Sequence, residues 1–203
     1  QPDSASVAGA RGNPGGTLAA NGNTTVNAAS LNNNGGTTAA VNGNLAVATS
    51  GVTTNAGGKL QTAGSLSVIA NAVDNTGGQV TGNSVAVTTN GGTLTNSNGG
   101  TIAALTTVNL NSGALANDAG LIQSGGAMVI NTNGQQFSNT NAAGYTNGQG
   151  GIASADNLSL TAGSVNNSAG FIGSKNALTA NTEEFSNTGG GQIIGQSTVD
   201  VNT

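Results

Sequence analysis

Short apolar stretches recur along the whole chain, and in most of them apolar and polar residues alternate. Each recurrence begins with a glycine, followed in most units by one variable residue and then an aliphatic one. The glycines are Gly16, Gly36, Gly58, Gly78, Gly100, Gly120, Gly150, Gly170 and Gly191, whose positions differ in succession by 20, 22, 20, 22, 20, 30, 20 and 21. A near-constant period of this length is typical of stacked repeats. The chain therefore contains about nine units of roughly 20 residues.

Each unit contains three short apolar pieces. The first is the aliphatic residue after the glycine, and the second is an alternating pair such as Leu66 and Val68. The third is an apolar residue two positions before an asparagine, such as Leu94 before Asn96. Alternation over such short pieces predicts β-strands. A helix would need three- and four-residue spacings and would lose about 1 kcal/mol at each glycine.

Three strands in one unit are too few to bury a hydrophobic face, but stacked units bury one together. Each strand then pairs in parallel with its equivalent in the next unit, about 4.8 Å away. The pattern predicts an all-β fold, a parallel β-helix (β-solenoid) of about nine coils, which forms a rod about 45 Å long at that spacing. We expect residues 15–203 to form this repeat domain and residues 1–14 to be a lead-in or partial coil.

The spacing between the second and third apolar pieces supports this interpretation. It is five residues in most units, as from Val47 to Val52, and seven in three units, as from Val87 to Leu94. The two spacings differ by the strand period of two, so the longer one keeps the next side chain facing inward. We therefore expect Val52 to face the core, although its unit deviates, since Asn55 follows Val52 by three positions.

The asparagines and glycines recur at one place in each unit, and we expect them to form a corner of the coil. Asparagine tolerates the left-handed backbone region and glycine enters it without penalty. Stacked asparagine amides also form hydrogen-bonded ladders. The predicted corner and ladder residues are Asn33, Asn55, Asn75, Asn96, Asn117, Asn139, Asn167 and Asn187, with Gly36, Gly58, Gly78, Gly100, Gly120, Gly150, Gly170 and Gly191.

The composition excludes most classes of catalytic and binding site. The chain has no cysteine and no histidine, which excludes thiolate and imidazole catalysis and the common zinc sites. Its only cations are Arg11, Lys59 and Lys175, too few for a nucleic-acid surface. It has no apolar run long enough for membrane insertion. We expect no cofactor, no metal and no nucleic-acid partner.

The acidic residues do not form a recognisable catalytic pair. Asp74 and Asp118 lie two units apart, or about 10 Å, which exceeds the carboxylate separations usual in glycoside hydrolysis. Glu183 and Glu184 are adjacent, and we expect them to point to opposite faces of a strand. The prediction is that this chain is not an enzyme, and a polysaccharide-acting β-helix enzyme is kept as the alternative.

A second alternative is an ice-binding solenoid, because threonine is abundant. That activity needs ranks of Thr-x-Thr on one flat face, whereas the threonine doublets here are mostly adjacent, as in Thr24 and Thr25. Neighbouring residues of a strand face opposite sides, so no threonine plane is expected.

One interval is longer than the others. The stretch from Gly120 to Gly150 includes an insertion at 140–149, which contains the only tyrosine, Tyr145. Insertions in repeat proteins leave as loops on one face and often contact partners, and tyrosine is enriched in binding hot spots. Tyr145 is the candidate partner-binding residue, and the alternative is a surface loop without a partner.

Three units carry a family likeness: GGTLAANGNTTVNAASLNNN (15–34), GGKLQTAGSLSVIANAVDNT (57–76) and AGFIGSKNALTANTEEFSNT (169–188). They resemble the degenerate repeats of filamentous haemagglutinin and its relatives, the large bacterial exoproteins exported by two-partner secretion. Contact-dependent growth inhibition proteins share these repeats. The resemblance implies a right-handed parallel β-helix, export through an outer-membrane partner barrel and a secreted, surface-associated fibre.

The function expected from the pattern and the resemblance is structural. The chain would be a fibre segment that acts as an adhesin against a receptor on a host or target cell, or as the stalk that presents a toxin in contact-dependent growth inhibition. Binding of the isolated segment to target cells would favour the adhesin.

Overall fold

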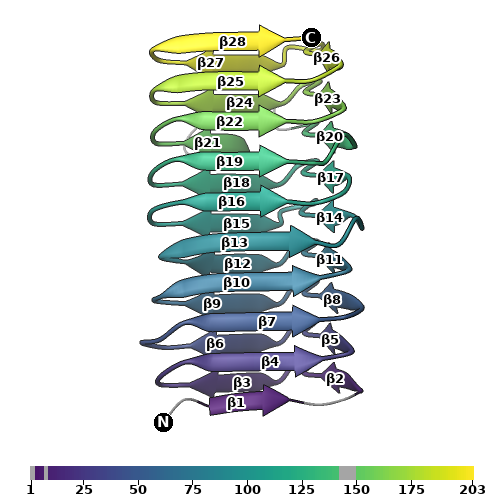
Figure 1. Cartoon of the computed structure of the whole chain (residues 1–203), viewed down its shortest axis with the longest axis vertical. Helices are drawn as coiled ribbons and strands as arrows, with labels where there is room; N and C mark the ends of the chain where they lie inside the picture. Colours follow the sequence, from purple (N-terminus) through teal and green to yellow (C-terminus); the bar gives the residue numbers. More distant parts are fainter. Residues whose placement is uncertain (1–2, 7–8, 142–149) are drawn as a thin grey trace.

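The computed structural model describes residues 3–6, 9–141 and 150–203. The described residues form three parallel β-sheets, and every strand pairs with its equivalent from the coil before or after it. The predicted parallel β-solenoid of about nine turns is confirmed. Figure 1 shows the sheets running side by side along the whole length of the stack.

Sheet A is the front layer of Figure 1 and contains the longest strands. Its strands are β1 (Asp3–Ser6), β4 (Thr24–Ala28), β7 (Leu45–Thr49), β10 (Ser65–Ala70), β13 (Ser84–Thr89), β16 (Val108–Asn111), β19 (Met128–Asn131), β22 (Leu158–Thr161), β25 (Ala177–Asn181) and β28 (Thr198–Asn202). The alternating apolar pairs of the sequence lie on these strands.

Sheet B lies at the right in Figure 1 and consists of strands of two or three residues. Its strands are β2 (Ala10–Gly12), β5 (Ser30–Asn32), β8 (Val52–Thr54), β11 (Ala72–Asp74), β14 (Leu94–Thr95), β17 (Leu115–Ala116), β20 (Gln136–Ser138), β23 (Ser164–Asn166) and β26 (Glu184–Ser186).

Sheet C is the rear layer, and its strands follow the corner glycines. Its strands are β3 (Thr17–Ala20), β6 (Thr37–Ala40), β9 (Lys59–Thr62), β12 (Gln79–Gly82), β15 (Thr101–Ala104), β18 (Leu121–Ser124), β21 (Gly151–Ser154), β24 (Phe171–Ser174) and β27 (Gln192–Gly195). The chain thus passes through sheets A, B and C in turn as it climbs from the N- to the C-terminus (Figure 1).

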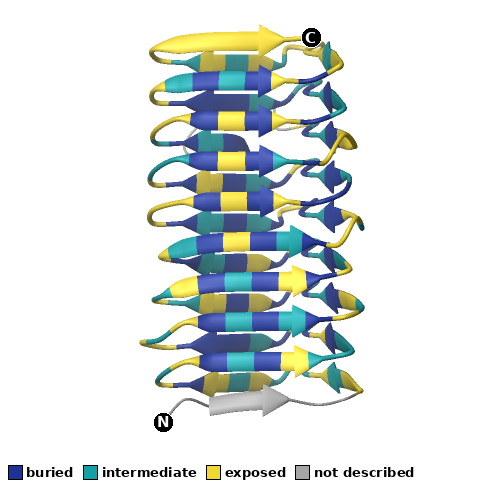
Figure 2. Cartoon of the chain, viewed as in Figure 1, coloured by how far each residue is buried: buried dark blue, intermediate teal, exposed yellow. Residues whose placement is uncertain are grey.

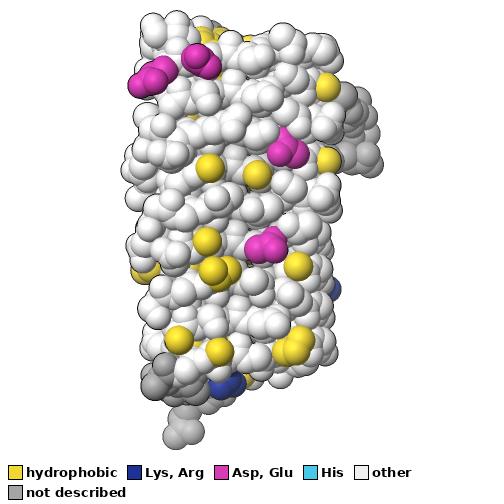
Figure 3. Space-filling model, turned by 90° about the vertical axis from the view of Figure 1, so that its right-hand side faces the viewer, with side chains coloured by type: hydrophobic (Ala, Val, Ile, Leu, Met, Phe, Trp, Pro, Cys, Tyr) yellow, Lys and Arg dark blue, Asp and Glu magenta, His cyan; other side chains and the backbone are white. Residues whose placement is uncertain are grey.

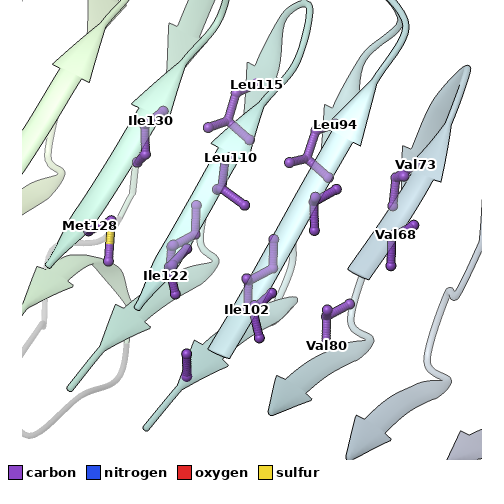
Figure 4. Packing of buried hydrophobic residues seen from close by; sticks show 14 of the residues in the cluster. Val68, Val73, Val80, Leu94, Ile102, Leu110, Leu115, Ile122, Met128 and Ile130 are labelled. Atoms are coloured by element: carbon purple, nitrogen blue, oxygen red, sulfur yellow. The ribbon is translucent and has the colours of Figure 1, made fainter. Parts of the chain in front are cut away.

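The core is a narrow column of aliphatic side chains between the three sheets. Figure 4 shows Leu110 from sheet A, Leu94 from sheet B and Ile102 from sheet C pointing into this interior, and none of the three is exposed to solvent. From β4 to β25, residues of sheet A that are buried alternate with residues that are partly or fully exposed (Figure 2). Full burial of an aliphatic side chain contributes about 1.5–3 kcal/mol relative to its exposure, so the stacking of coils supplies the stability that one coil lacks.

The expectation that Val52 faces the core is wrong. Val52 is 40% exposed, whereas Thr53 is fully buried and pairs in register with Val73 of the next coil. The inward-facing residues Val47 and Thr53 are therefore six positions apart. The chain bends at Gly51 between β7 and β8, and a period of two holds only within an extended strand. This bend therefore contains one residue more than the bends with a spacing of five, and the inward position moves from Val52 to Thr53.

The two ends of the chain differ from the middle. Strands β1 and β2, within residues 1–14, already pair with β4 and β5 as a first partial coil. In the last coil, Val199 and Val201 pair with β25 on one side only and are 40% and 39% exposed.

Candidate functional site: the asparagine corner

An asparagine comes directly after the last residue of each strand of sheet B, and its side chain points into the corner between sheets B and C. The amides of Asn33, Asn55, Asn75, Asn96, Asn117, Asn139 and Asn167 are fully buried, and Asn187 in the last coil is exposed. An unpaired buried amide would cost several kcal/mol. The hydrogen-bond partners of these side chains therefore show whether the corner is a structural element or a binding site.

The structure brings the predicted asparagines together into one continuous chain of hydrogen bonds. In each coil, Nδ2 donates to Oδ1 of the asparagine in the next coil at 2.7 or 2.8 Å, all in the same direction. The order is Asn33, Asn55, Asn75, Asn96, Asn117, Asn139, Asn167 and Asn187. Aligned hydrogen-bonded dipoles polarise one another and strengthen the chain.

Five of the ladder amides also donate to the carbonyl oxygen of the corner glycine in their own turn; these are Asn33, Asn55, Asn75, Asn96 and Asn117. The Nδ2 atom of Asn96 lies 3.1 Å from the carbonyl oxygen of Gly100 in its own coil and 3.0 Å from that of Leu121 in the next. Asn96 Nδ2 also donates to Oδ1 of Asn117, so its two hydrogens are shared among three acceptor oxygens. The amide has no hydrogen left for a ligand, so the corner is a structural element.

The ladder begins one coil earlier than the sequence pattern indicated. The half-buried Asn13 donates from Nδ2 to Oδ1 of Asn33 at 2.8 Å. The pattern of an apolar residue two positions before asparagine missed it, because Arg11 occupies that position. Counting back one repeat period from Asn33 would have found it.

The role predicted for the corner glycines is partly wrong. The left-handed conformation lies one residue earlier, at Gly57 with φ of 60° and at Ala119 with φ of 53°, not at Gly58 or Gly120. A Cβ atom at Gly58 would lie 2.1 Å from the carbonyl oxygen of Asn33 in the preceding coil. The corner glycines with such a contact, at 1.9–2.5 Å, are Gly36, Gly58, Gly78, Gly100, Gly120, Gly170 and Gly191. These positions need glycine because the backbones of successive coils approach closely there.

Gly150 takes the corresponding place after the insertion, where it is buried and directly precedes β21. The next residue, Gly151, donates its backbone N–H to Gly120 of the preceding coil at 2.7 Å. The stack therefore continues across the longest interval of the sequence. Tyr145 and the rest of 142–149 lie outside the described residues.

A second polar column, at the corner between sheets A and B, was not predicted. Here a buried hydroxyl donates to a backbone carbonyl of the adjoining turn, as from Thr89 to Gly92 at 2.6 Å. The residues at this place are Thr49, Thr89, Ser112, Thr132 and Thr182. Alanine takes it in other coils, at Ala70 and Ala162, which hides the column from the sequence pattern.

The two corner carboxylates accept hydrogen bonds from backbone and hydroxyl groups, Asp74 within its own turn and Asp118 from the next coil. One oxygen of Asp74 accepts from the backbone N–H of Thr76 at 3.0 Å and from its hydroxyl at 2.6 Å. Asp118 accepts from the hydroxyl of Ser138 and from the N–H and hydroxyl of Thr140. Burial raises the pKa of Asp118, but these hydrogen bonds outweigh it and hold the pKa below its ordinary value. A carboxylate of this kind is a poor general acid near neutral pH.

The two glutamates were the other acidic pair considered from the sequence. Glu183 and Glu184 are both exposed, and Glu183 lies in the turn before β26, so the expectation of opposite faces of one strand is wrong. The described residues contain no group of three metal-ligating side chains. Figure 3 shows that the face bearing sheet B is mostly uncharged, with a few isolated acidic groups. A hollow of about 190 Å³ on sheet C is lined by Phe171, Gly173 and Lys175 among others and holds no carboxylate.

The threonine doublets form no flat plane in the described residues. Thr24 is buried while Thr25 is partly exposed, and Thr88 and Thr89 differ in the same way. None of the described residues belongs to a helix that could cross a membrane.

Comparison with protein families finds one match. A family described as haemagglutinin repeat matches four overlapping segments, residues 4–51, 40–98, 83–141 and 136–203. These segments together cover nearly the whole chain. Comparisons with curated proteins and with solved structures find no match.

Proposed function

The chain belongs to the haemagglutinin-repeat family, and from this premise we propose that it is a structural fibre segment of a filamentous haemagglutinin-type exoprotein. In this role it supplies length and stiffness at the bacterial surface and performs no reaction. The supporting observation is the unbroken amide ladder from Asn13 to Asn187, which ties each coil to the next by side chains as well as backbone.

The composition fits a chain that is exported unfolded. With no cysteine and only ten ionisable side chains among Lys, Arg, Asp and Glu, it carries few groups that would hinder passage through a pore. Folding outside the cell would proceed coil by coil, because each repeat contacts only its neighbours. The proposed partners are therefore an outer-membrane secretion barrel for the parent protein and a receptor on a host or target cell.

Two uses of such a fibre remain to be separated: an adhesin that meets the receptor with this segment, and a stalk that carries a toxin. They differ in whether the segment itself binds cells. Fluorescent beads coated with the 203-residue chain, and control beads coated with an unrelated β-solenoid, would be counted on host cells and on bacteria. Binding above the control favours the adhesin, and binding equal to it favours the stalk.

The fibre proposal itself is tested by assaying surface polysaccharides for cleavage by the same preparation. Release of reducing ends at a rate abolished by Asp74→Asn or Asp118→Asn would contradict a purely structural role. We expect no release, because each of these carboxylates is hydrogen-bonded to a turn.

A further inference from the structure

The chain contains seven Asn-Gly pairs, of which six lie among the described residues. Such a pair can modify itself, because glycine has no Cβ to hinder attack by its backbone nitrogen. That nitrogen bonds to Cγ of the asparagine and the Cγ–Nδ2 bond breaks. Nδ2 leaves as ammonia, and the proton that the backbone nitrogen loses passes through water to the leaving ammonia. Water then opens the five-membered imide to aspartate or isoaspartate. The sum is asparagine plus water giving an acid plus ammonia, with no redox partner.

A folded chain blocks this reaction in two ways. It holds the attacking nitrogen when the glycine N–H donates a hydrogen bond, and it holds the target when the asparagine amide is hydrogen-bonded away from the glycine. Gly99 shows the first restraint, since its N–H donates to Ala119 at 2.8 Å. Asn21 shows the second, since its Oδ1 accepts from Asn42 at 2.8 Å.

Five of the six described pairs carry at least one restraint. The restrained pairs are Asn21–Gly22, Asn34–Gly35, Asn42–Gly43, Asn98–Gly99 and Asn133–Gly134. Among the described residues, only Asn90–Gly91 has neither a hydrogen bond at the asparagine side chain nor one donated by the glycine nitrogen.

The location of this pair also favours the reaction. Asn90 and Gly91 are both exposed, in the bend that joins β13 to β14. Nothing within 4 Å surrounds the Cβ position of Gly91, so water reaches the pair and the bend has room to change. We propose that Asn90–Gly91 is a self-modification site, at which the uncharged bend between β13 and β14 acquires a carboxylate by deamidation.

The fold is expected to tolerate the product. Isoaspartate adds one carbon to the backbone path, and this bend belongs to a coil in which Val87 and Leu94 are seven residues apart rather than five. The buried neighbours on either side, Thr89 and Leu94, keep their places in the stack. The modification would therefore change surface charge without unfolding the coil.

The chain supplies its own matched control. Asn90–Gly91–Gly92 and Asn98–Gly99–Gly100 are the same tripeptide, and both asparagines are exposed. They differ in the hydrogen bond from Gly99 to Ala119 and in the left-handed backbone of Asn98, whose φ is 52°. The folded 203-residue chain would be incubated at mildly alkaline pH and mapped by peptide mass spectrometry over time. We expect deamidation at Asn90 about tenfold faster than at Asn98, a ratio that corresponds to about 1.4 kcal/mol and lies within the range of net contributions of one hydrogen bond.

The same incubation in denaturant removes the fold, and the two sites should then react at similar rates. Equal rates at Asn90 and Asn98 in the folded chain would overturn the proposal, as would a rate difference that persists in denaturant. In Asn90→Gln, the early mass change should disappear from the peptide that contains residues 90 and 91. Its persistence in that peptide would assign the reaction to another residue and contradict the proposal.

Discussion

The side-chain nitrogen of Asn75 lies 2.7 Å from the side-chain oxygen of Asn96, although 21 residues separate them. That separation is one coil, so the bond joins equivalent positions of two successive repeats. It forms because Gly78 and Gly100 let successive backbones approach closely at the corner. The asparagine and the glycine three or four residues later therefore act together. The glycine allows two coils to approach closely, and the amide hydrogen bond requires this close approach.

Replacing a ladder asparagine by aspartate should destabilise the stack. In Asn96→Asp, a carboxylate without hydrogens would face three acceptor oxygens, on Gly100, Asn117 and Leu121. We expect a loss of about 3 kcal/mol or more, the penalty for a buried charge without donors. The matched control is Asn98→Asp, which makes the same change of charge at an exposed position. Urea denaturation followed by far-UV circular dichroism compares them, and equal midpoints would contradict the role of the ladder.

Two neighbouring glycines should respond very differently to alanine. Gly58→Ala places a Cβ 2.1 Å from the carbonyl oxygen of Asn33 and forces two coils apart, which we expect to cost about 3 kcal/mol. Gly57→Ala meets no atom within 4 Å but must adopt φ of 60°, which costs about 1 kcal/mol. Thermal unfolding of the two variants should show the larger loss at Gly58, and the reverse order would show that backbone conformation dominates.

Two of the described coils have an alanine, Ala119 or Ala169, where others have glycine in the left-handed region. Ala119 has φ of 53°, a conformation that costs an L-residue about 1–2 kcal/mol. Ala119→Gly relieves this strain. Glycine also raises the conformational entropy of the unfolded chain, which lowers the free energy of unfolding by about 0.4–1 kcal/mol. The net expectation is a gain of about 0.5 kcal/mol in the free energy of unfolding. A lower melting temperature for this variant would show that the alanine methyl group makes a contact worth more than the strain.

The low pKa of Asp118 makes stability depend on pH in one direction. Because the folded-state pKa lies below its ordinary value of 3.8, the carboxylate stabilises the fold fully above that value. This contribution is lost as the pH falls through the lower, folded-state pKa. The variant Asp118→Asn cannot ionise, so the wild-type advantage in melting temperature should be largest near neutrality and shrink in acid. An advantage that is constant with pH would mean that the hydrogen bonds do not depend on the charge.

The inward set of side chains was predictable because strand alternation is a local rule. Leu66 and Val68 lie two positions apart on one strand and are both buried, as their spacing indicated. The rule failed where it was extended across a bend, at Val52 and Thr53. A bend can contain an odd or an even number of residues, so the face taken by the next strand depends on the turn itself.

The corner could be located from the sequence, but its physical cause could not. Glycine at position 58 is compatible with either a left-handed backbone or a close contact, and the contact involves Asn33 of the preceding coil. Asn13 was missed for a different reason, since Arg11 replaces the apolar residue of the pattern, although the repeat period points to it. Contacts between coils decide the role of the glycine, and a single repeat does not contain them.

Distances along the rod test the central claim that each coil adds one constant step. Thr25, Asn109 and Ser159 lie in one column of sheet A, and Asn109 and Ser159 are four and six coils from Thr25 in the strand register. The chain has no cysteine, so pairs of cysteine substitutions at these positions accept spin labels without background.

Pulsed electron spin resonance on the labelled pairs Thr25/Asn109 and Thr25/Ser159 is the most direct measurement. At about 4.8 Å per coil, the backbone separations should be about 19 Å and about 29 Å, so that the second label distance exceeds the first by two coil steps. Equal distances for the two pairs, or a longer distance for Thr25/Asn109, would contradict the stacked solenoid.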